Sequence, residues 1–536
     1  MLTDRAIRAP ATRPLAERAA RYALPALGLV ALAWSLVPTL IALRTRAHGG
    51  GVYSGADGLF VGDQFQYFSW IRDAGEHVLA SNLLSLAPSA RVFLHPMFTP
   101  SGLLWSAGVD MQVVYALWKP VASAFLVAGF WLYARRMFED RLRAVAATAI
   151  ALGAWPAAEI AVRVAGIGSA ADRSNLETLA GGQFALSYLW GYLPLAIAAG
   201  LMPLYFLGLE RLLDSARRRE GRSASWYAGW TAAAGFLTAW LHPWQGEVLL
   251  VVTGVVLAPR LRRWRELLPA AVPVGMTVLP IAGYFLLSKL DASWELAARN
   301  NRAGLYPLWT LVATFGPIGA LALIGALRSP ALGLQERVVR VWPLAALVTY
   351  VALSPSVPFH ALEATSLPLA VLAVRAFRGR AGLAAVLAAL GVLAALGALR
   401  SVTLVRDSIH SGEQAYVFTP GEAAAFRYLD GVARPGGVLA PTHITTAVPA
   451  YTGRATWLGH PSWTPDFFGR SRQAEALFSG AMTPAASAAF VAGTGARFVL
   501  SDCRHPLDLT TRLGSLAGPP VRFGCASVYE LRRAGS

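Results

Sequence analysis

Long apolar segments recur along this chain from Ala23 to Leu399, separated by short polar connections. About eleven of them are long enough to cross a hydrocarbon layer of roughly 30 Å. The segments lack the two-residue alternation of β-strands, and only helices and closed barrels satisfy their backbone hydrogen bonds in lipid. The pattern therefore predicts a polytopic α-helical membrane bundle over residues 23–400.

The composition supports this prediction. Hydrophobic residues make up 55% of the 536 residues and charged residues only 14%, which is too apolar for a soluble protein of this length. The first segment, from Ala23 to Leu43, is too long for a signal-peptide core and lacks a convincing cleavage site. We expect it to be a retained anchor.

The basic residues are confined to alternate connections. Clusters of arginine lie in the tail 1–22 and near 135–143, 211–222, 260–265, 328–340 and 375–380. The positive-inside rule predicts that all of these are cytoplasmic, so that the other loops and everything after residue 400 are extracytoplasmic. The net charge of +17 is thus explained by membrane topology, and we expect no nucleic-acid partner.

The first predicted external loop, residues 44–111, is too long for a simple connection and is rich in aromatic residues. Asp63 follows a glycine near its start, and nearby aromatic side chains such as Tyr67 could bind a sugar or a lipid. An acid held near a bilayer is a candidate general base, although a hydrated loop also needs polar residues. The segment Phe65–Leu84 has near-helical apolar spacing and forms either an interfacial helix or a plain packing helix. Both interpretations place Asp63 at a helix start.

Two further polar groups fall in predicted external loops. His242 and Glu247 flank a Pro-Trp-Gln-Gly turn between apolar segments, and neither is needed for the turn itself. Lys289, Arg299 and Arg302 form a basic group that departs from the positive-inside trend. This group could bind the phosphate of a lipid-linked donor, or simply contact lipid headgroups. Together with the loop 354–363, these segments are predicted to converge on the face that carries Asp63.

After residue 400 the composition changes to that of a small soluble domain. Residues 421–432 predict a helix, and residues 437–440, 497–500 and 527–531 predict strands, so we expect an extracytoplasmic α/β domain over 401–536. Cys503 and Cys525, the two cysteines of the chain, either form a disulfide there or remain idle thiols. His460 and its neighbours Tyr451, Arg454 and Trp457 are expected to serve domain packing.

The layout resembles the GT-C superfamily of membrane glycosyltransferases, which includes protein O-mannosyltransferase-like and lipid A aminoarabinose transferase-like enzymes. The resemblance rests on the many spans, the acid early in a long first loop, and the tail. The tail motifs that look like bacterial members are Pro449-Ala450-Tyr451-Thr452-Gly453-Arg454, Gly459-His460 and Thr464-Pro465-Asp466.

This resemblance implies transfer of a sugar from a polyprenyl-phosphate carrier to a lipid, glycan or protein acceptor on the outer face of a bacterial plasma membrane. Asp63 would be the base, and Arg302, with Arg299 or Lys289, would stabilise the departing phosphate. Many relatives have two adjacent acids in the first loop, whereas Asp63 is followed by Gln64 here. Dependence on a divalent cation is therefore left open.

A second class of function competes with the enzyme. A lipid-linked-glycan transporter should carry ionisable residues at mid-membrane, for which Glu159 and Arg163 are the main candidates. A polysaccharide-assembly partner should tolerate the loss of Asp63, whereas a transferase should not.

Overall fold

The computed structural model describes residues 22–532 apart from 331–332, 354–355 and 413. The predicted cytoplasmic tail 1–22 lies outside the described residues except for its last position. The chain divides into two compact units, each built from three segments. The helical unit contains Met1–Ser35, Lys119–Ala282 and Ala303–Arg400, and the mixed unit contains Leu36–Trp118, Gly283–Arg302 and Ser401–Ser536.

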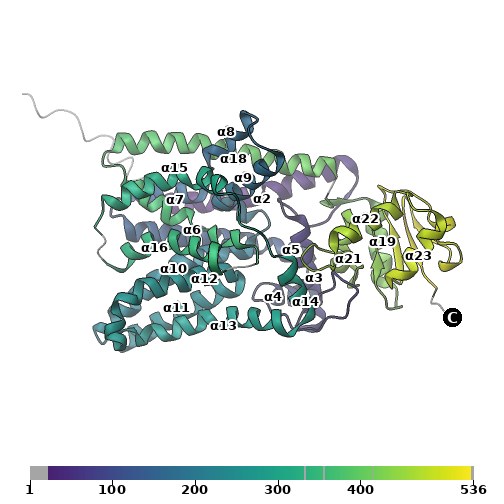
Figure 1. Cartoon of the computed structure of the whole chain (residues 1–536), viewed down its shortest axis with the longest axis horizontal. Helices are drawn as coiled ribbons and strands as arrows, with labels where there is room; N and C mark the ends of the chain where they lie inside the picture. Colours follow the sequence, from purple (N-terminus) through teal and green to yellow (C-terminus); the bar gives the residue numbers. More distant parts are fainter. Residues whose placement is uncertain (1–21, 331–332, 354–355, 413, 533–536) are drawn as a thin grey trace, which may run out of the picture. The chain divides into compact units, whose positions relative to one another are not determined.

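The helical unit is a bundle of apolar helices joined by short connections (Figure 1). It contains α7 (Arg141–Gly153), α8 (Ala157–Val164), α9 (Ala170–Gln183), α10 (Leu193–Arg217), α11 (Gly221–Leu241), α12 (Pro243–Leu257), α15 (Leu308–Leu327), α16 (Leu334–Val348) and α17 (Ser366–Arg375), the 3₁₀ helices η1 (Ala185–Leu189), η2 (Ala258–Leu267) and η4 (Pro358–Leu362), the π-helix η3 (Thr349–Leu353), and most of α6 (Trp118–Met137) and α13 (Leu268–Leu290). Two long helices, α2 (Ala23–Gly49) and α18 (Arg380–Ser411), belong partly to this unit.

Six helical stretches in the described residues are long and apolar enough to cross a membrane. They are Ala23–Arg46, Met111–Met137, Leu193–Arg217, Pro243–Leu290, Leu308–Leu327 and Ala381–Ser411, and the bent pair α7 and α8 adds a seventh if it is one span. The polytopic helical fold is thus confirmed. The stretches are fewer than the roughly eleven apolar runs, because Pro243–Leu290 joins α12, η2 and α13 in one stretch, while α11, α16 and α17 are too short or not apolar enough.

Close packing in this bundle depends on small residues, as is usual for membrane helices. A Cβ atom on Gly129 of α6 would lie 2.0 Å from the carbonyl oxygen of Gly200 in α10. A Cβ atom on Gly200 would lie 2.2 Å from the carbonyl oxygen of Phe125. The backbones of α6 and α10 therefore touch where both helices have glycine.

In the mixed unit the predicted first loop is folded rather than extended. It contains β1 (Val52–Tyr53), α3 (Val61–His77), α4 (Phe98–Ser106) and α5 (Met111–Ala116), and α14 (Ala292–Asn300) joins the same unit. β1 pairs in antiparallel fashion with β2 (Val417–Phe418), so the first loop and the tail share a small two-stranded sheet.

The tail forms the predicted small α/β domain around a four-stranded sheet. The strands β3 (Val438–Leu439), β4 (Phe498–Ser501), β5 (Val521–Phe523) and β6 (Ala526–Glu530) lie in the order β3-β4-β6-β5. β3 is parallel to β4, and the other pairs are antiparallel. The helices are α19 (Pro420–Gly431), α20 (Thr442–Thr445), α21 (Ala447–Thr452), α22 (Phe467–Phe478), α23 (Pro484–Thr494) and α24 (Thr510–Leu513).

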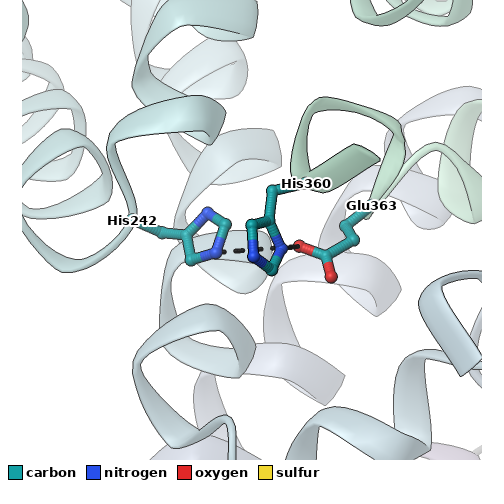
Figure 2. Close-up of side chains that lie close together, drawn as sticks. All are labelled: His242, His360 and Glu363. Atoms are coloured by element: carbon teal, nitrogen blue, oxygen red, sulfur yellow. Dashed lines mark hydrogen bonds and ion pairs between the residues drawn. The ribbon is translucent and has the colours of Figure 1, made fainter. Parts of the chain in front are cut away.

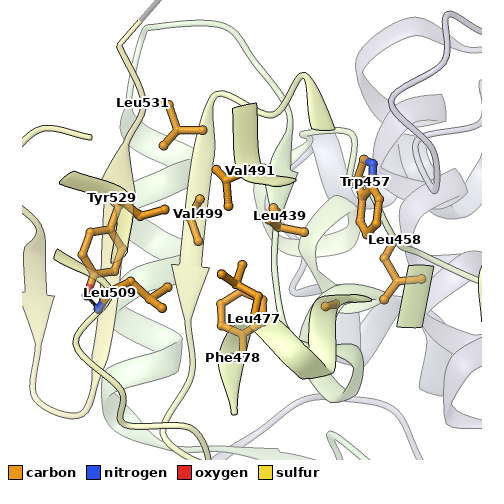
Figure 3. Packing of buried hydrophobic residues seen from close by; sticks show 12 residues of the cluster. Leu439, Trp457, Leu458, Leu477, Phe478, Val491, Val499, Leu509, Tyr529 and Leu531 are labelled. Atoms are coloured by element: carbon orange, nitrogen blue, oxygen red, sulfur yellow. Dashed lines mark hydrogen bonds between the residues drawn. The ribbon is translucent and has the colours of Figure 1, made fainter. Parts of the chain in front are cut away.

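A buried apolar cluster holds this domain together (Figure 3). Val499 of the central strand β4 packs with Leu477 and Phe478 of α22 and with Val491 of α23. Burial of each of these side chains stabilises the fold by about 1.5–3 kcal/mol. The segment that follows β4 is further tied to the β5–β6 turn by a disulfide between Cys503 and Cys525.

Candidate active site

A cavity of about 580 Å³ opens at the start of α3 in the mixed unit. Its walls come from the first loop and from four parts of the tail, near 414–415, 442–446, 459–475 and 504–505. The ionisable residues that line it are Asp63, His443, His460, Glu475, Arg504 and His505. Such a volume is within the range of small-molecule sites, and the acids and imidazoles share the wall with apolar side chains such as Phe60 and Phe467.

Asp63 lies in the first turn of α3, where the positive end of the helix dipole favours a negative charge. Its Oδ1 atom is 3.0 Å from Nε2 of His460, and its side chain remains 26% exposed. The carboxylate is thus both oriented by a partner and open to the cavity.

His460 is itself held in one orientation. Its Nδ1 atom accepts a hydrogen bond from the backbone N–H of Ser462, at 3.2 Å. Because Nδ1 is an acceptor, the neutral imidazole carries its proton on Nε2, the atom that faces Oδ1 of Asp63. The turn that carries His460 is fixed by Thr464, whose hydroxyl accepts from the N–H of Gly459 and donates to the carbonyl of Leu84.

A second polar network lines the same cavity. Asp502 lies with its Oδ2 atom 2.7 Å from Nδ1 of His443 and its Oδ1 atom 3.1 Å from Nδ1 of His505. Burial alone would raise the pKa of Asp502, but the contacts of His443 and His505 outweigh burial and hold the pKa below its ordinary value. We therefore expect Asp502 to be ionised and to orient both imidazoles.

Glu422, His443 and Asp502 also have the spacing of a metal-ligand group. Both oxygens of Glu422 are already used, because they accept hydrogen bonds from the backbone N–H groups of Thr419 and Cys503. Asp502 likewise accepts from the backbone N–H of His505. These carboxylates cap α19 and the loop after β4, which favours a structural role over metal binding.

The other predicted binding residues of the mixed unit lie outside the lining of this cavity. Lys289, Arg299 and Arg302 are exposed. The side-chain amide of Asn300, next to Arg299, donates to the carbonyl of Pro461 at 3.1 Å, and Pro461 does line the cavity. The basic group is thus tied to the segment that follows His460.

Tyr67 lies one turn after Asp63 on α3, but its ring packs in an aromatic cluster. It stacks on Phe98 at 5.0 Å between ring centroids and lies 6.3 Å from Trp70. It is not among the residues that line the cavity.

His242 and Glu247 belong to the helical unit. His242 lies at the break between α11 and α12, and its Nε2 atom is 3.6 Å from Oε2 of Glu363. The predicted convergence of the loops 242–247 and 354–363 is therefore seen within this unit. Glu247 is largely buried in α12, and one of its carboxylate oxygens has no hydrogen-bond partner among the described residues.

Several residues of these sites were not recognised in the sequence. His460 was assigned to domain packing, and His443, Asp502 and His360 were not singled out. The local signals are weak, because a histidine between glycine and proline, as in Gly459-His460-Pro461, is common in turns. The partners lie far away in the sequence, so local patterns do not reveal them.

Comparison with solved structures identifies the fold. The chain is similar to ArnT from Cupriavidus metallidurans, solved bound to undecaprenyl phosphate and in the apo state, with a TM-score of 0.51 in both cases. The identities are 13% and 12%, over 95% and 96% of this chain and 98% of ArnT. A weaker similarity, with a TM-score of 0.44, is found to the oligosaccharyltransferase AglB from Archaeoglobus fulgidus, at 16% identity over 90% of this chain and 70% of AglB.

No protein-family model matches the sequence, and no curated protein matches it. The structural likeness to ArnT covers nearly the whole of both chains. The chain thus has the fold of the GT-C membrane glycosyltransferases, and the predicted resemblance to that superfamily is confirmed at the level of the fold.

Proposed function

We propose that this protein is a membrane glycosyltransferase that moves a sugar from a polyprenyl-phosphate carrier to an acceptor hydroxyl on the extracytoplasmic face. The observation that carries the proposal is the close approach of Nε2 of His460 to Oδ1 of Asp63, at 3.0 Å, in the wall of a cavity of about 580 Å³. ArnT, which has the same fold, was solved with undecaprenyl phosphate bound. The disulfide between Cys503 and Cys525 supports an extracytoplasmic tail, because disulfides persist in oxidising compartments.

In this proposal Asp63 acts as the general base. Its carboxylate removes the proton of the acceptor hydroxyl while that oxygen attacks the anomeric carbon, and the bond between the anomeric carbon and the phosphate oxygen breaks. Nε2 of His460 lies 3.0 Å from Oδ1 of Asp63 and orients this carboxylate at the wall of the cavity. His460 is therefore a positioning residue. The direct displacement inverts the configuration of the anomeric carbon.

The negative charge that develops on the leaving phosphate needs a positive partner. Arg302, with Arg299 or Lys289, is the proposed group, because these side chains are exposed and Asn300 links them to the segment after His460. A guanidinium group can donate two parallel hydrogen bonds to a phosphate, and this geometry suits a departing phosphate better than the single ammonium of lysine does. His242, Glu247 and Tyr67 remain proposed donor-binding residues.

Gln64 occupies the position next to Asp63 where many relatives have a second acid. Its side chain is fully buried and exchanges two hydrogen bonds with the backbone of Asp57, one of them from the N–H of Asp57 to Oε1 at 2.9 Å. Gln64 therefore fixes the approach to α3 and is not a free ligand. If a divalent cation takes part, its ligands must come from other residues, and the assay below includes arms with and without added Mn²⁺ or Mg²⁺.

The test is transfer of labelled sugar from a panel of polyprenyl-phosphate sugars by the purified full-length protein, with a panel of acceptors present. Asp63→Asn is compared with wild type at equal folded amounts. The matched control is Glu76→Gln, which changes an exposed acid on the same helix that pairs with Arg72. Loss of transfer in Asp63→Asn together with full activity in Glu76→Gln supports the proposal.

Two other outcomes have definite meanings. Equal activity of Asp63→Asn and wild type keeps the transferase but moves the base to another residue. If wild type binds the carrier without transferring the sugar, and Asp63→Asn binds the carrier equally well, the result favours a transporter or an assembly partner. Glu159 and Arg163, the candidate transport residues, form an ion pair with each other, and Arg163 also pairs with Glu177. Their charges are therefore balanced within the protein.

A further inference from the structure

Two histidines and one glutamate meet in the interior of the helical unit (Figure 2). His242 lies at the start of α12, His360 in η4, and Glu363 directly after η4. Each is 6–7% exposed. One ligand atom from each residue lies within 4.8 Å of the other two. The fold brings His242 to His360 and Glu363, which lie more than a hundred positions later in the sequence.

The distances suit shared ligation better than hydrogen bonding. Nδ1 of His360 lies 2.9 Å from Oε2 of Glu363, but Nε2 of His242 lies 3.6 Å from the same oxygen, too far for a hydrogen bond. Ligand atoms placed about 2.0–2.1 Å from a tetrahedral Zn²⁺ ion are about 3.3 Å apart. The two distances to Oε2 of Glu363 are thus within a few tenths of an ångström of this spacing, and all three ligand atoms lie within 4.8 Å of one another.

His242 gives an independent indication. Its Nδ1 atom is buried and has no hydrogen-bond partner among the described residues, and Nε2 makes only the 3.6 Å contact with Glu363. Buried imidazoles without any hydrogen bond are rare, because each unsatisfied polar atom costs about 1–3 kcal/mol. A bond from Nε2 to a metal ion gives this buried ring a strong interaction in place of the 3.6 Å contact with Glu363.

The surroundings hold the three groups in place. The side-chain amide of Gln245 donates to the carbonyl of His360 at 2.7 Å and to the carbonyl of Glu363 at 3.3 Å, so the first turn of α12 clamps the loop. The rings of Trp244 and Phe359 lie 4.7 Å and 4.3 Å from the ring of His360. Fixed ligands inside an aromatic shell are typical of metal centres.

We propose that His242, His360 and Glu363 form a site for a zinc-class divalent transition metal, with three protein ligands and a fourth position left for water or another oxygen ligand. Two imidazole nitrogens and one carboxylate favour zinc, cobalt or related ions over Mg²⁺ and Ca²⁺, which prefer all-oxygen sites. The ion binds neutral imidazoles and an ionised carboxylate, with the remaining proton of each ring on the nitrogen that does not face the ion. His242 is also one of the proposed donor-binding residues, but metal binding by these three ligands does not require the transferase proposal to hold.

The test is metal binding by the purified, tag-free full-length protein in detergent. After treatment with a chelator and dialysis, the protein is titrated with Zn²⁺ and with Co²⁺, bound metal is measured by mass spectrometry, and the Co²⁺ spectrum reports the coordination number. We expect one ion per chain, a spectrum of four nitrogen and oxygen ligands, and little competition from Mg²⁺.

The variants His242→Ala, His360→Ala and Glu363→Gln are expected to weaken metal binding at least tenfold. Even residues that only hydrogen-bond to a metal ligand typically contribute about tenfold or more to metal affinity. His443→Ala is the matched control, because it alters the other histidine cluster and should leave the affinity unchanged. Glu363→Gln keeps the size of the side chain, so it serves where an alanine variant does not fold.

Two results would overturn the proposal. One is wild-type protein that binds no stoichiometric Zn²⁺ or Co²⁺ after removal of the chelator. The other is stoichiometric binding that Glu363→Gln and the histidine variants leave unchanged while His443→Ala abolishes it, which would assign the metal to the cluster of Glu422, His443 and Asp502.

Discussion

The Nε2 atom of His460, in the tail, lies 3.0 Å from Oδ1 of Asp63, in the first loop. The backbone N–H of Ser462 fixes the tautomer of His460, so the imidazole can only donate toward Asp63. If Asp63 is the base, the loss of this neighbour weakens the orientation of its carboxylate and changes its proton affinity.

We therefore expect His460→Ala to lower kcat about tenfold or more, because general-base catalysis is worth about 10²–10⁴ and depends on orientation. His460→Gln, which retains an N–H donor, should recover part of the activity. The pH profile of kcat/KM separates this role from a structural one: the acidic limb should move upward in His460→Ala, since a carboxylate that loses a donor holds its proton more tightly. An unmoved limb with reduced folded protein would assign His460 to stability alone.

His95 predicts a pH dependence of stability. Burial lowers the pKa of His95 to about 3, from an ordinary value of 6.5. Its Nδ1 atom faces the N–H groups of Met97 and Phe98 at the start of α4, which requires the unprotonated ring. Because the folded pKa is the lower one, the unfolded chain binds more protons below pH 6.5. The contribution of His95 is thus complete above pH 6.5 and is lost as the pH falls from there toward 3.

The expected slope is up to about 1.4 kcal/mol per pH unit within this window. Thermal unfolding in detergent, followed by tryptophan fluorescence at a series of pH values, measures it. His95→Gln should flatten the acid side of the curve relative to wild type, whereas the exposed His410→Gln should run parallel to wild type. Parallel curves for both variants would show that His95 does not titrate as expected.

The contact between α6 and α10 predicts a steric effect. In Gly129→Ala the new methyl group would meet the carbonyl oxygen of Gly200 at 2.0 Å, so the helices must separate. We expect a loss of about 1–3 kcal/mol, the usual cost of overpacking. Gly275→Ala in α13 is the control, because a Cβ atom there meets nothing within 4 Å. It should be neutral or slightly stabilising in the same detergent unfolding assay, and equal losses in both variants would argue against the helix contact.

The disulfide predicts a stabilisation of the tail. Cys503 and Cys525 are 22 positions apart, and closing a loop of this length in the unfolded chain is worth about 3 kcal/mol in the chain-entropy model. The double variant Cys503→Ala/Cys525→Ala should unfold at a lower temperature than wild type and should no longer respond to reductant. Wild type should show the same lowering when reduced. A wild-type midpoint that reductant does not change would contradict this prediction.

The sequence by itself determined the architecture. Apolar runs of membrane length define the helices, because burial in lipid depends on local hydropathy and helical hydrogen bonds close within one segment. The change of composition after residue 400 likewise located the small α/β domain. The helix predicted over Phe65–Leu84 is found as α3, which includes Asp63 in its first turn but runs only from Val61 to His77, because Val78 has a φ of 71° and ends the helix.

Only the tertiary structure decided which side chains share a site. Asp63 meets His460 because the tail pairs with the first loop through β1 and β2, and no periodicity along the chain encodes that contact. His242 meets Glu363 through another long-range contact, because the side chain of Gln245 donates a hydrogen bond to the carbonyl of Glu363. Hydrophobic patterns specify which face of an element is buried, whereas a site depends on long-range contacts made when those faces pack.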